Sequence, residues 1–339
     1  MAQREARSGR VFSGIQPSGE LHLGNYLGAV RHWVTAQEAR NAFYCIVDLH
    51  AMSLPWEPAE LRARTVETGA LLIACGLDPK RSGLFVQSQV PAHAELSWIL
   101  SCVARMGELR RMVQFKEKSM GASESVGVGL FTYPVLQAAD VLLYRASGVP
   151  VGEDQRQHIE LMRDLAVRFN RRFGDTFVAP HAEIAASGAR IMSLDDPTQK
   201  MSKSVGGPGS KVLLIDPPEA ITKKIRSAVT DSGRRVAAGE GKPALTNLIT
   251  LYALAEGSSV AAVEERFSSA GYGEFKNALA DLLVATLAPI RQRYDELISD
   301  RAETERLLGS GAAAAAEVAE TTMRDVRARV GLPERAVPS

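Results

Sequence analysis

The sequence predicts an α/β protein in two parts, a doubly wound parallel sheet of the Rossmann-like type followed by an α-helical bundle. The first half alternates short apolar runs with segments of helical period, as parallel sheets covered by helices on both faces do. The second half is helical in period almost throughout. Because 339 residues are many for one core, we expect two domains, at 1–204 and 205–339.

Each element of the first half has its own signal. Apolar runs bounded by Gly or Pro indicate strands, and apolar residues three and four apart indicate helices. In chain order these signals predict a strand at Val11–Ser13, a turn at Gly14–Glu20, a helix at Leu21–Glu38, a strand at Ala42–Ala51, a helix at Leu61–Cys75, a strand at Gly83–Gln89, a helix at Ala94–Arg105, a helix across Thr132–Tyr144, a strand that runs into a polar turn at Val149–Gln155, and a helix at Gln157–Phe169.

Between residues 92 and 129 the pattern loosens. The charged stretch Glu108–Lys118 precedes a Gly/Ser-rich stretch, Ser119–Gly129, which leaves little to bury. We therefore expect an insertion in the sheet topology with a mobile loop. Its charges belong either to a solvated helix face or to a functional surface.

The second half contains signals for five helices. Gly, Pro and Ser separate segments of helical period. The expected helices are Ala220–Ala228, Ala244–Ala255, Val260–Phe267, Glu274–Asp300 and Ala302–Val330.

Composition describes an ordinary globular protein. Apolar residues make up 45% and charged residues 23% of the chain, and no apolar run approaches the roughly 18 residues that span a membrane. We expect a cytoplasmic protein that neither enters a membrane nor carries a secretory signal. Cys45, Cys75 and Cys102 form no C-x-x-C pair and lie in apolar stretches, so they are expected to be reduced core thiols.

Net charge gives no sign of a nucleic-acid binder. The formal net charge is +1, and the part after residue 204 carries almost equal numbers of basic and acidic residues. A polyanionic partner would therefore have to be met by local patches.

Two distant segments together describe a site for the triphosphate of ATP. His22, Gly24 and Asn25 open a helix directly after a strand, where free N–H groups and a partial positive charge favour phosphate. Gly24 would let a nucleotide approach the backbone closely. The segment Lys200-Met201-Ser202-Lys203-Ser204 adds two ammonium groups.

Polar residues in two other blocks are further candidates. At 3.6 residues per turn, Tyr133, Gln137 and Asp140 fall on one helix face and can point into one pocket. Asp140 lies among apolar neighbours, so it either has a buried partner or accepts a hydrogen bond from a ligand. Glu153 and Asp154 either favour the dipole of the helix that follows them or contact ribose or magnesium.

These residues together resemble the class I aminoacyl-tRNA synthetases and, more closely, the tryptophanyl group of bacterial or mitochondrial type. The resemblance runs from Arg10 to about Leu332. Its blocks are Phe12–Gly19 (FSGIQPSG), His22–Gly28 (HLGNYLG), Ile46–His50 (IVDLH), Thr132–Tyr144, Val149–Leu161, and Ile191–Ser204, which ends in KMSKS.

The resemblance implies a two-step reaction. Tryptophan and Mg²⁺-bound ATP would give tryptophanyl-adenylate and pyrophosphate, and the acyl group would then pass to the 3′ end of tRNA(Trp). His22, Lys200 and Lys203 would stabilise the phosphate charge, with no metal held by the protein itself. The helical domain would hold the tRNA anticodon, and the 92–129 insertion would form the contact of a homodimer.

The same resemblance implies two sets of binding residues. The ATP contacts would be Gln16, Pro17, Ser18, Gly24, Asn25, Gly152, Glu153, Asp154, Ile191, Lys200, Met201, Ser202, Lys203 and Ser204. Asp140 would accept the indole N–H of tryptophan, and the residues around the amino acid would be Phe12, Gly14, Val47, His50, Tyr133, Gln137 and Gln155.

Two departures from the common pattern leave alternatives open. Asn25 stands where many class I enzymes have His, as is usual in the tryptophanyl group, and Gln137 stands where many bacterial relatives have Met. With Tyr133 and Asp140, Gln137 resembles the amino-acid pocket of tyrosyl-tRNA synthetases, which makes tyrosine activation an alternative. A synthetase-like protein that only binds tRNA or adenylate is another, and a small HxGH nucleotidyltransferase is a remote third.

Overall fold

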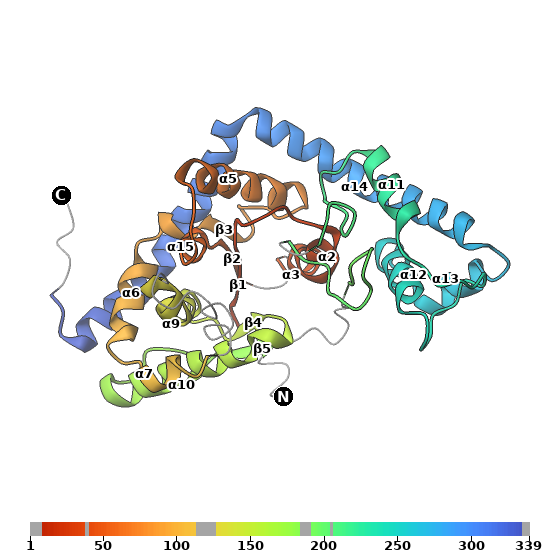
Figure 1. The fold of residues 1–339 in the computed structure, drawn as a ribbon. Coiled ribbons are helices and arrows are strands. Elements are labelled where there is room, and N and C mark those ends of the chain that lie inside the picture. The colour runs from red at the N-terminus through yellow and green to blue at the C-terminus, as the bar shows by residue number, and fades with distance from the viewer. Residues whose placement is uncertain (1–8, 38–40, 113–126, 184–190, 204–205, 334–339) are drawn as a thin grey trace.

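Five parallel strands form one sheet in the part of the chain that the computed structural model describes, residues 9–37, 41–112, 127–183, 191–203 and 206–333 (Figure 1). The strand order is β3-β2-β1-β4-β5, so the winding reverses between β1 and β4, as in a doubly wound Rossmann sheet. Ligands of such sheets bind beyond the carboxyl ends of the strands at this reversal. The strands are β1 Val11–Ile15, β2 Ala42–Ile46, β3 Gly83–Val86, β4 Gly148–Pro150 and β5 His181–Glu183.

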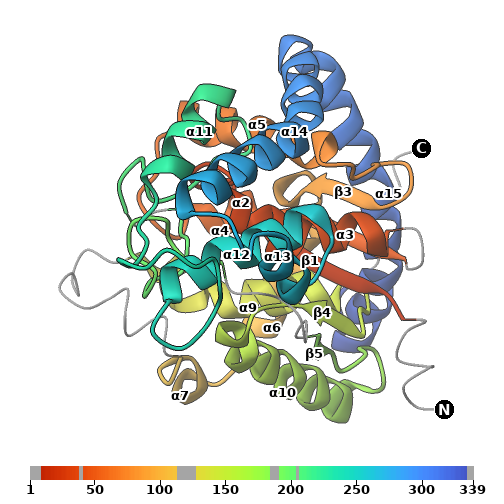
Figure 2. The ribbon, with the colours of Figure 1, turned by 90° about the vertical axis from the view of Figure 1, so that its right-hand side faces the viewer.

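Helices cover both faces of this sheet and continue into a helical part (Figures 1 and 2). Nearly every helix expected from the sequence is present, with bounds that differ by a few residues. The helices are α2 Leu23–Asn25, α3 Arg31–Ala36, α4 Asp48–Ala51, α5 Pro58–Ala74, α6 Ala92–Ser101, α7 Met106–Leu109, α9 Val128–Leu142, α10 Arg156–Phe173, α11 Pro218–Ser227, α12 Pro243–Glu256, α13 Val260–Arg266, α14 Tyr272–Ser299 and α15 Arg301–Val330. A π-helical turn, Tyr26–Val30, joins α2 to α3.

Two predicted strands are shorter than expected, because each stops at the carboxyl edge of the sheet. The run Ala42–Ala51 is a strand only to Ile46 and then becomes α4. The run Gly83–Gln89 leaves the sheet after Val86, and its last three residues form a 3₁₀ turn. The side chain of Asp48 accepts hydrogen bonds from the backbone N–H of Ser88 at 3.0 Å and from its hydroxyl at 2.5 Å. This polar contact ties together the two turns that follow the strands.

The sheet separates two hydrophobic clusters. One cluster includes Leu72 of α5 and Leu84 of β3 and continues into α12 and α14. The other contains Phe85 on the opposite face of β3 and Val135 of α9, together with α10 and α15. Both faces of the sheet are therefore buried, as the apolar runs predicted.

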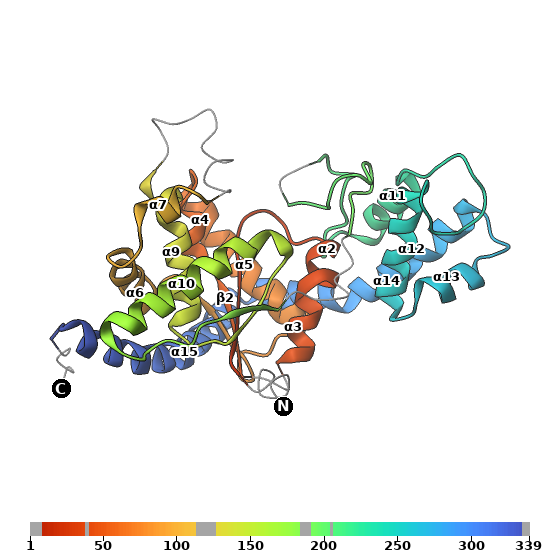
Figure 3. The ribbon, with the colours of Figure 1, turned by 90° about the horizontal axis from the view of Figure 1, so that it is seen from below.

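Helix α15 does not stay with the helical part that precedes it. Helices α11, α12 and α13 lie at one end of the molecule, whereas α15 runs back along the sheet (Figures 1 and 3). Its residue Gly311 lies so close to the backbone of β3 that an added Cβ would be 1.9 Å from the carbonyl oxygen of Leu84. Near its end, Arg327 pairs with Glu95 of α6 through two hydrogen bonds of 2.7 and 2.8 Å.

Two other expectations can be compared with this fold. The predicted loop Ser119–Gly129 falls mostly outside the described residues, and its last two residues already belong to α9. Cys45 and Cys75 are buried free thiols, but Cys102 is an exposed one. The prediction of a core thiol is wrong there, because α6 turns Leu96 and Leu100 inward and Cys102, which directly follows the helix, lies on the outer side with Trp98.

None of the helices in the described ranges combines the length and the apolar character that crossing a bilayer requires.

Candidate functional site

A cavity of about 670 Å³ lies between the carboxyl end of β4, at Pro150, and the start of α2, the first helix after β1. This is the position that the reversal in strand order predicts for a ligand. Eight of the residues predicted to contact ATP line it, together with His22: Gly24, Asn25, Gly152, Glu153, Asp154, Ile191, Lys200 and Met201.

His22 caps the start of α2 and is buried. Its backbone N–H donates to the side-chain oxygen of Asn25 at 3.1 Å, which fixes the first turn. Burial, followed by the positive charge of Lys203 and of two further lysines, lowers the pKa of His22 to about 4. The imidazole is therefore neutral at pH 7, and its Nδ1 atom has no hydrogen-bond partner among the described residues.

Gly24 allows the imidazole to sit against this turn. A Cβ at Gly24 would lie 3.0 Å from Nδ1 of His22 and 3.5 Å from Cβ of Met201. The absence of a side chain at Gly24 thus makes room for protein atoms of both phosphate motifs, a role that the sequence did not predict.

The Lys-rich loop meets the glycine-rich turn directly. The ammonium group of Lys203 donates to the backbone oxygen of Gln16 at 3.1 Å. A Cβ at Gly19, which has φ +62°, would lie 3.2 Å from Cβ of Lys203. Burial lowers the pKa of Lys203 to about 8. The two segments that the sequence analysis assigned to one ATP site thus lie side by side. Ser204, the last residue of the loop motif, falls outside the described residues.

The loop is anchored by backbone pairing on its other side. Met201 is buried, and its N–H donates to the backbone oxygen of Ile191 at 3.0 Å. Lys200 forms an antiparallel bridge with Met192. The Ile191 block and the Lys-rich loop therefore form one structural unit.

Glu153 and Asp154 lie on a 3₁₀ turn, Glu153–Gln155, that leads into α10. Glu153 is exposed and pairs with Arg156 at 2.6 Å, and Asp154 accepts a hydrogen bond from Gln155 at 2.9 Å. The structural interpretation of Glu153, as a charged residue at a helix start, is therefore supported, and both side chains also border the cavity.

Asp140 of α9 lies at the centre of a second polar cluster and is buried. Its Oδ1 accepts hydrogen bonds from Nε2 of Gln87 at 2.7 Å and Nδ1 of His93 at 2.6 Å. Its Oδ2 lies 2.7 Å from Nε2 of His50. Burial alone would raise the pKa of Asp140, but the two histidines outweigh it and hold the pKa of this carboxyl well below its usual range. The structure thus contains the buried partners that were one of the two alternatives for Asp140.

Residues predicted to surround an amino acid lie around this carboxylate. The ring of Tyr133 meets the ring of His50 edge-on, with centroids 6.3 Å apart. Gln137 donates to Gln155 at 3.3 Å, which links α9 to the turn before α10. Gly14 faces Val47, because a Cβ added to the glycine would lie 3.0 Å from Cγ1 of the valine.

An aromatic layer lies beneath the same cluster. The ring of Phe12 stacks on that of Tyr144 at 5.4 Å, and the Tyr144 hydroxyl lies 2.9 Å from Nε2 of His93. This arrangement joins strand β1 to the carboxylate through two side chains.

Four residues of these clusters were not identified from the sequence. Gln87 was assigned to a strand, and His93 and Tyr144 carry no spacing signal that links them to Asp140. Lys211 follows the Lys-rich loop in a segment without a recognisable pattern. Their polar contacts become informative only when the tertiary structure is known.

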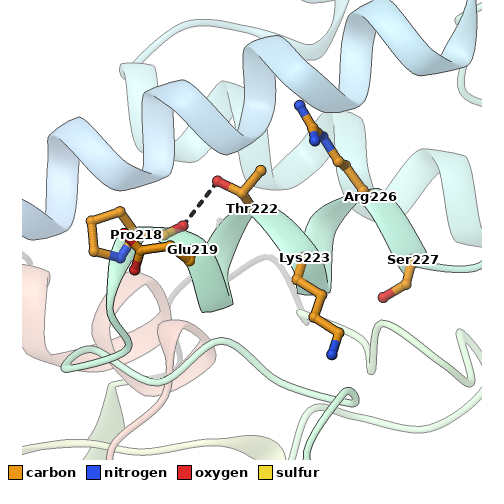
Figure 4. Close-up of a pocket in the computed structure, with 6 residues that line it drawn as sticks. All are labelled: Pro218, Glu219, Thr222, Lys223, Arg226 and Ser227. Atoms are coloured by element: carbon orange, nitrogen blue, oxygen red, sulfur yellow. Dashed lines mark hydrogen bonds between the residues drawn. The ribbon is translucent and has the colours of Figure 1, made fainter.

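A second hollow, of about 710 Å³, lies on one face of α11 (Figure 4). Figure 4 shows that the six lining residues come from a single helix, and the hydroxyl of Thr222 donates to the backbone oxygen of Pro218 at 2.9 Å. It contains none of the predicted site residues, so the cavity between β4 and α2 is the better candidate for chemistry.

The fold and the site together define a class I synthetase. The family model for class I tRNA synthetases (W and Y) matches residues 4–288. The chain belongs to this family.

Relatives and solved structures specify the resemblance further. Tryptophan–tRNA ligase from Gloeobacter violaceus is 51% identical over 323 residues, which are 95% of this chain and 96% of that protein. The structure of tryptophanyl-tRNA synthetase from Mycoplasma pneumoniae has a TM-score of 0.86 at 34% identity and covers 96% of this chain and 98% of its own. That of the Campylobacter jejuni enzyme, complexed with ADP and tryptophan, has a TM-score of 0.83 at 34% identity, with coverage of 95% and 100%.

Proposed function

We infer that the chain is a tryptophan–tRNA ligase, an aminoacyl-tRNA synthetase that activates L-tryptophan with ATP and transfers it to the 3′ end of tRNA(Trp). The observation that carries this function is the contact between the Lys203 loop and the glycine-rich turn at the carboxyl edge of β1. It places Lys203 beside the glycine-rich turn, while Lys200 of the same loop and His22 at the helix start line the cavity, as a triphosphate requires.

In the activation step, the carboxylate of tryptophan attacks the α-phosphate of ATP and pyrophosphate leaves. Neutral His22 donates its ring N–H to a phosphate oxygen, and Lys200 and Lys203 stabilise the charge that develops on pyrophosphate. The protein forms no covalent bond to the substrate in this scheme, so positioning and charge stabilisation account for the rate. Gln16, Pro17 and Ser18 of the turn and the residues lining the cavity hold the nucleotide.

Mg²⁺ enters this scheme as a companion of ATP. Among the described residues no three His, Cys, Asp or Glu side chains gather as metal ligands. Mg²⁺ in nucleotide sites is held largely by phosphate oxygens and water, so in this proposal the ion arrives with ATP.

Asp140 recognises tryptophan in this proposal. A carboxylate accepts about four hydrogen bonds, and Oδ1 of Asp140 already accepts two. Oδ2 has His50 as its partner and retains a position for the indole N–H. Phe12, Gly14, Val47, Tyr133, Gln137 and Gln155 surround the rest of the amino acid.

The tRNA and a second copy of the chain complete the proposed assembly, which works in the cytoplasm. The helical part after residue 204 holds the anticodon. The homodimer contact lies near the 92–129 insertion, where Trp98 is 73%, Met106 59% and Val128 76% exposed. Large apolar side chains that are this exposed are typical of an interaction surface.

The test is ATP–pyrophosphate exchange with each standard amino acid, followed by charging of tRNA(Trp). We expect exchange with tryptophan that requires Mg²⁺. Exchange with tyrosine would establish the tyrosyl alternative instead. No exchange with any amino acid would favour a synthetase-like binding protein.

A further inference from the structure

Lys211 joins the Lys-rich loop to a fixed part of the protein. Its ammonium group donates to the backbone oxygen of Ser202 at 3.0 Å and to that of Lys203 at 2.7 Å. Hydrogen bonds from a charged donor are about twice as strong as neutral ones. Two of them on consecutive carbonyl groups hold the backbone from which the Lys203 side chain extends.

The backbone of Lys211 is itself anchored on both sides. Its neighbour Ser210 accepts a hydrogen bond from the N–H of Leu194 at 2.9 Å, and its neighbour Val212 accepts one from Leu23 at 2.8 Å. An antiparallel bridge pairs His22 with Leu213. Lys211 therefore extends from a segment that is paired with the start of α2, the element that carries His22.

This geometry sets the distance between the two halves of the phosphate site. One half is the helix start with His22, and the other is the loop with Lys203. The positive charge of Lys211 also acts within the site, because it is among the causes that lower the pKa of His22, after burial and Lys203. A displacement of the loop by about 1 Å would move the Lys203 ammonium away from the phosphate, and errors of that size cost enzymes about 10²-fold in rate.

We propose that Lys211 is a positioning residue for ATP activation, which holds the backbone of Ser202 and Lys203 so that the Lys203 ammonium faces the phosphates. Lys211 acts through Lys203 and makes no contact with ATP. This inference rests on the proposed activation of tryptophan by ATP.

The first test is Lys211→Met, which keeps the length of the side chain and removes its donors. We expect kcat for tryptophan-dependent exchange to fall between about 10- and 100-fold, with a smaller change in KM for ATP, because the loss falls on a transition-state contact. Lys211→Arg retains charged donors and should recover most of the rate. Lys223→Met removes an exposed charge on α11 and serves as the matched control with unchanged exchange.

A double-mutant cycle separates positioning from direct contact. In a Lys203→Ala background, Lys211→Met should cost less than about threefold, because the residue through which it acts is gone. If the double variant instead lost rate by the product of the two single-variant losses, the proposal would be overturned, and Lys211 would act on ATP itself or on the fold.

Limited trypsin digestion gives a readout that does not depend on catalysis. Release of the loop in Lys211→Met should speed cleavage after Lys203, while Lys223→Met leaves that rate unchanged. Unchanged cleavage together with unchanged kcat would overturn the proposal. If the unmodified protein exchanges with no amino acid, the proposed function fails, and faster cleavage would then establish only the structural tether.

Discussion

At the scale of single residues, the candidate site contains one buried group that is ionised, Asp140, and one that is neutral, His22. Asp140 stays ionised although it is buried, because Gln87, His93 and His50 direct hydrogen bonds at its two oxygens. His22 stays neutral because it is buried beside lysines. The cluster around Asp140 thus holds a fixed negative charge, and the cavity beside His22 offers an uncharged donor among positive charges.

Asp140→Asn should lower tryptophan activation by about 10²-fold or more. The side-chain NH₂ of the new asparagine would face groups that themselves donate hydrogen bonds, so at least one bond is lost. Hydrogen bonds to charged groups contribute about 1.5–3 kcal/mol. Exchange kinetics should be measured with tryptophan and with an analogue that has sulfur in place of the indole N–H, alongside the thermal midpoint of each variant. The unmodified enzyme should prefer tryptophan strongly and Asp140→Asn should not; a preference that persists would limit Asp140 to its buried contacts.

Lys203 should impose an upper pH limit on catalysis. Because its pKa is lowered to about 8 in the free protein, the ammonium form is complete below that pH and is lost above it. The value of kcat/KM for ATP reports the free enzyme, so it should fall as pH rises through about 8. In Lys203→Arg the guanidinium keeps its charge, so the fall of kcat/KM near pH 8 should disappear. If the fall persists in this variant, another group causes it.

At the scale of elements, the sequence predicts the regular parts well and the functional edge less well. The helices after residue 217 agree within a few residues, because apolar period and Gly or Pro breaks are local signals. The ends of β2 and β3 were misassigned because the apolar runs continue past Ile46 and Val86, where the pairing between strands that are distant in sequence stops. Strand β5 and the π-helical turn had no local signal that we recognised.

The same division applies to the candidate site. Residues in contiguous motifs, such as His22 and Lys203, were identified from the chain alone. Gln87, His93 and Lys211 contact partners on other elements, and single-sequence patterns do not report such contacts. The motifs therefore define the candidate site, and the fold shows which further residues contact its parts.

Gly311→Ala should destabilise the contact between α15 and β3. The new methyl group would lie 1.9 Å from the backbone oxygen of Leu84, and overpacking of this kind costs about 1–3 kcal/mol. Gly309→Ala, on the same helix with nothing within 4 Å, is the matched control and should be neutral or stabilising by up to ~1 kcal/mol. Urea midpoints compare the two variants; equal midpoints would mean that α15 does not depend on this close approach.

At the scale of the whole molecule, the two ends present different surfaces. The end with α6 and α7 exposes Trp98 and Met106, and the opposite end consists of α11, α12 and α13 (Figure 3). In the proposed assembly a second copy of the chain occupies the first end and the tRNA anticodon the second. The catalytic cavity lies between them, at the carboxyl edge of the sheet.

Trp98→Glu should convert the proposed homodimer into a monomer. A charge at the centre of an apolar contact must be desolvated without a partner, which opposes association. Sedimentation velocity at micromolar concentration measures the mass, and Val229→Glu, at a side chain that is 45% exposed outside the insertion, is the control that stays dimeric. A Trp98→Glu dimer would place the contact elsewhere, and a monomeric unmodified protein would remove the dimer from the proposal.

The return of α15 to the sheet has a consequence for synthesis on the ribosome. Arg327 and Glu95, which pair in the finished protein, are 232 positions apart, so β3 emerges long before the helix that covers it. A bare edge strand is a template for pairing with other chains. A chain that stalls before Arg301 already carries the residues of the cavity and still exposes this edge. Truncated chains therefore differ from complete chains by the exposed edge of β3, which makes them targets for chaperones and proteases.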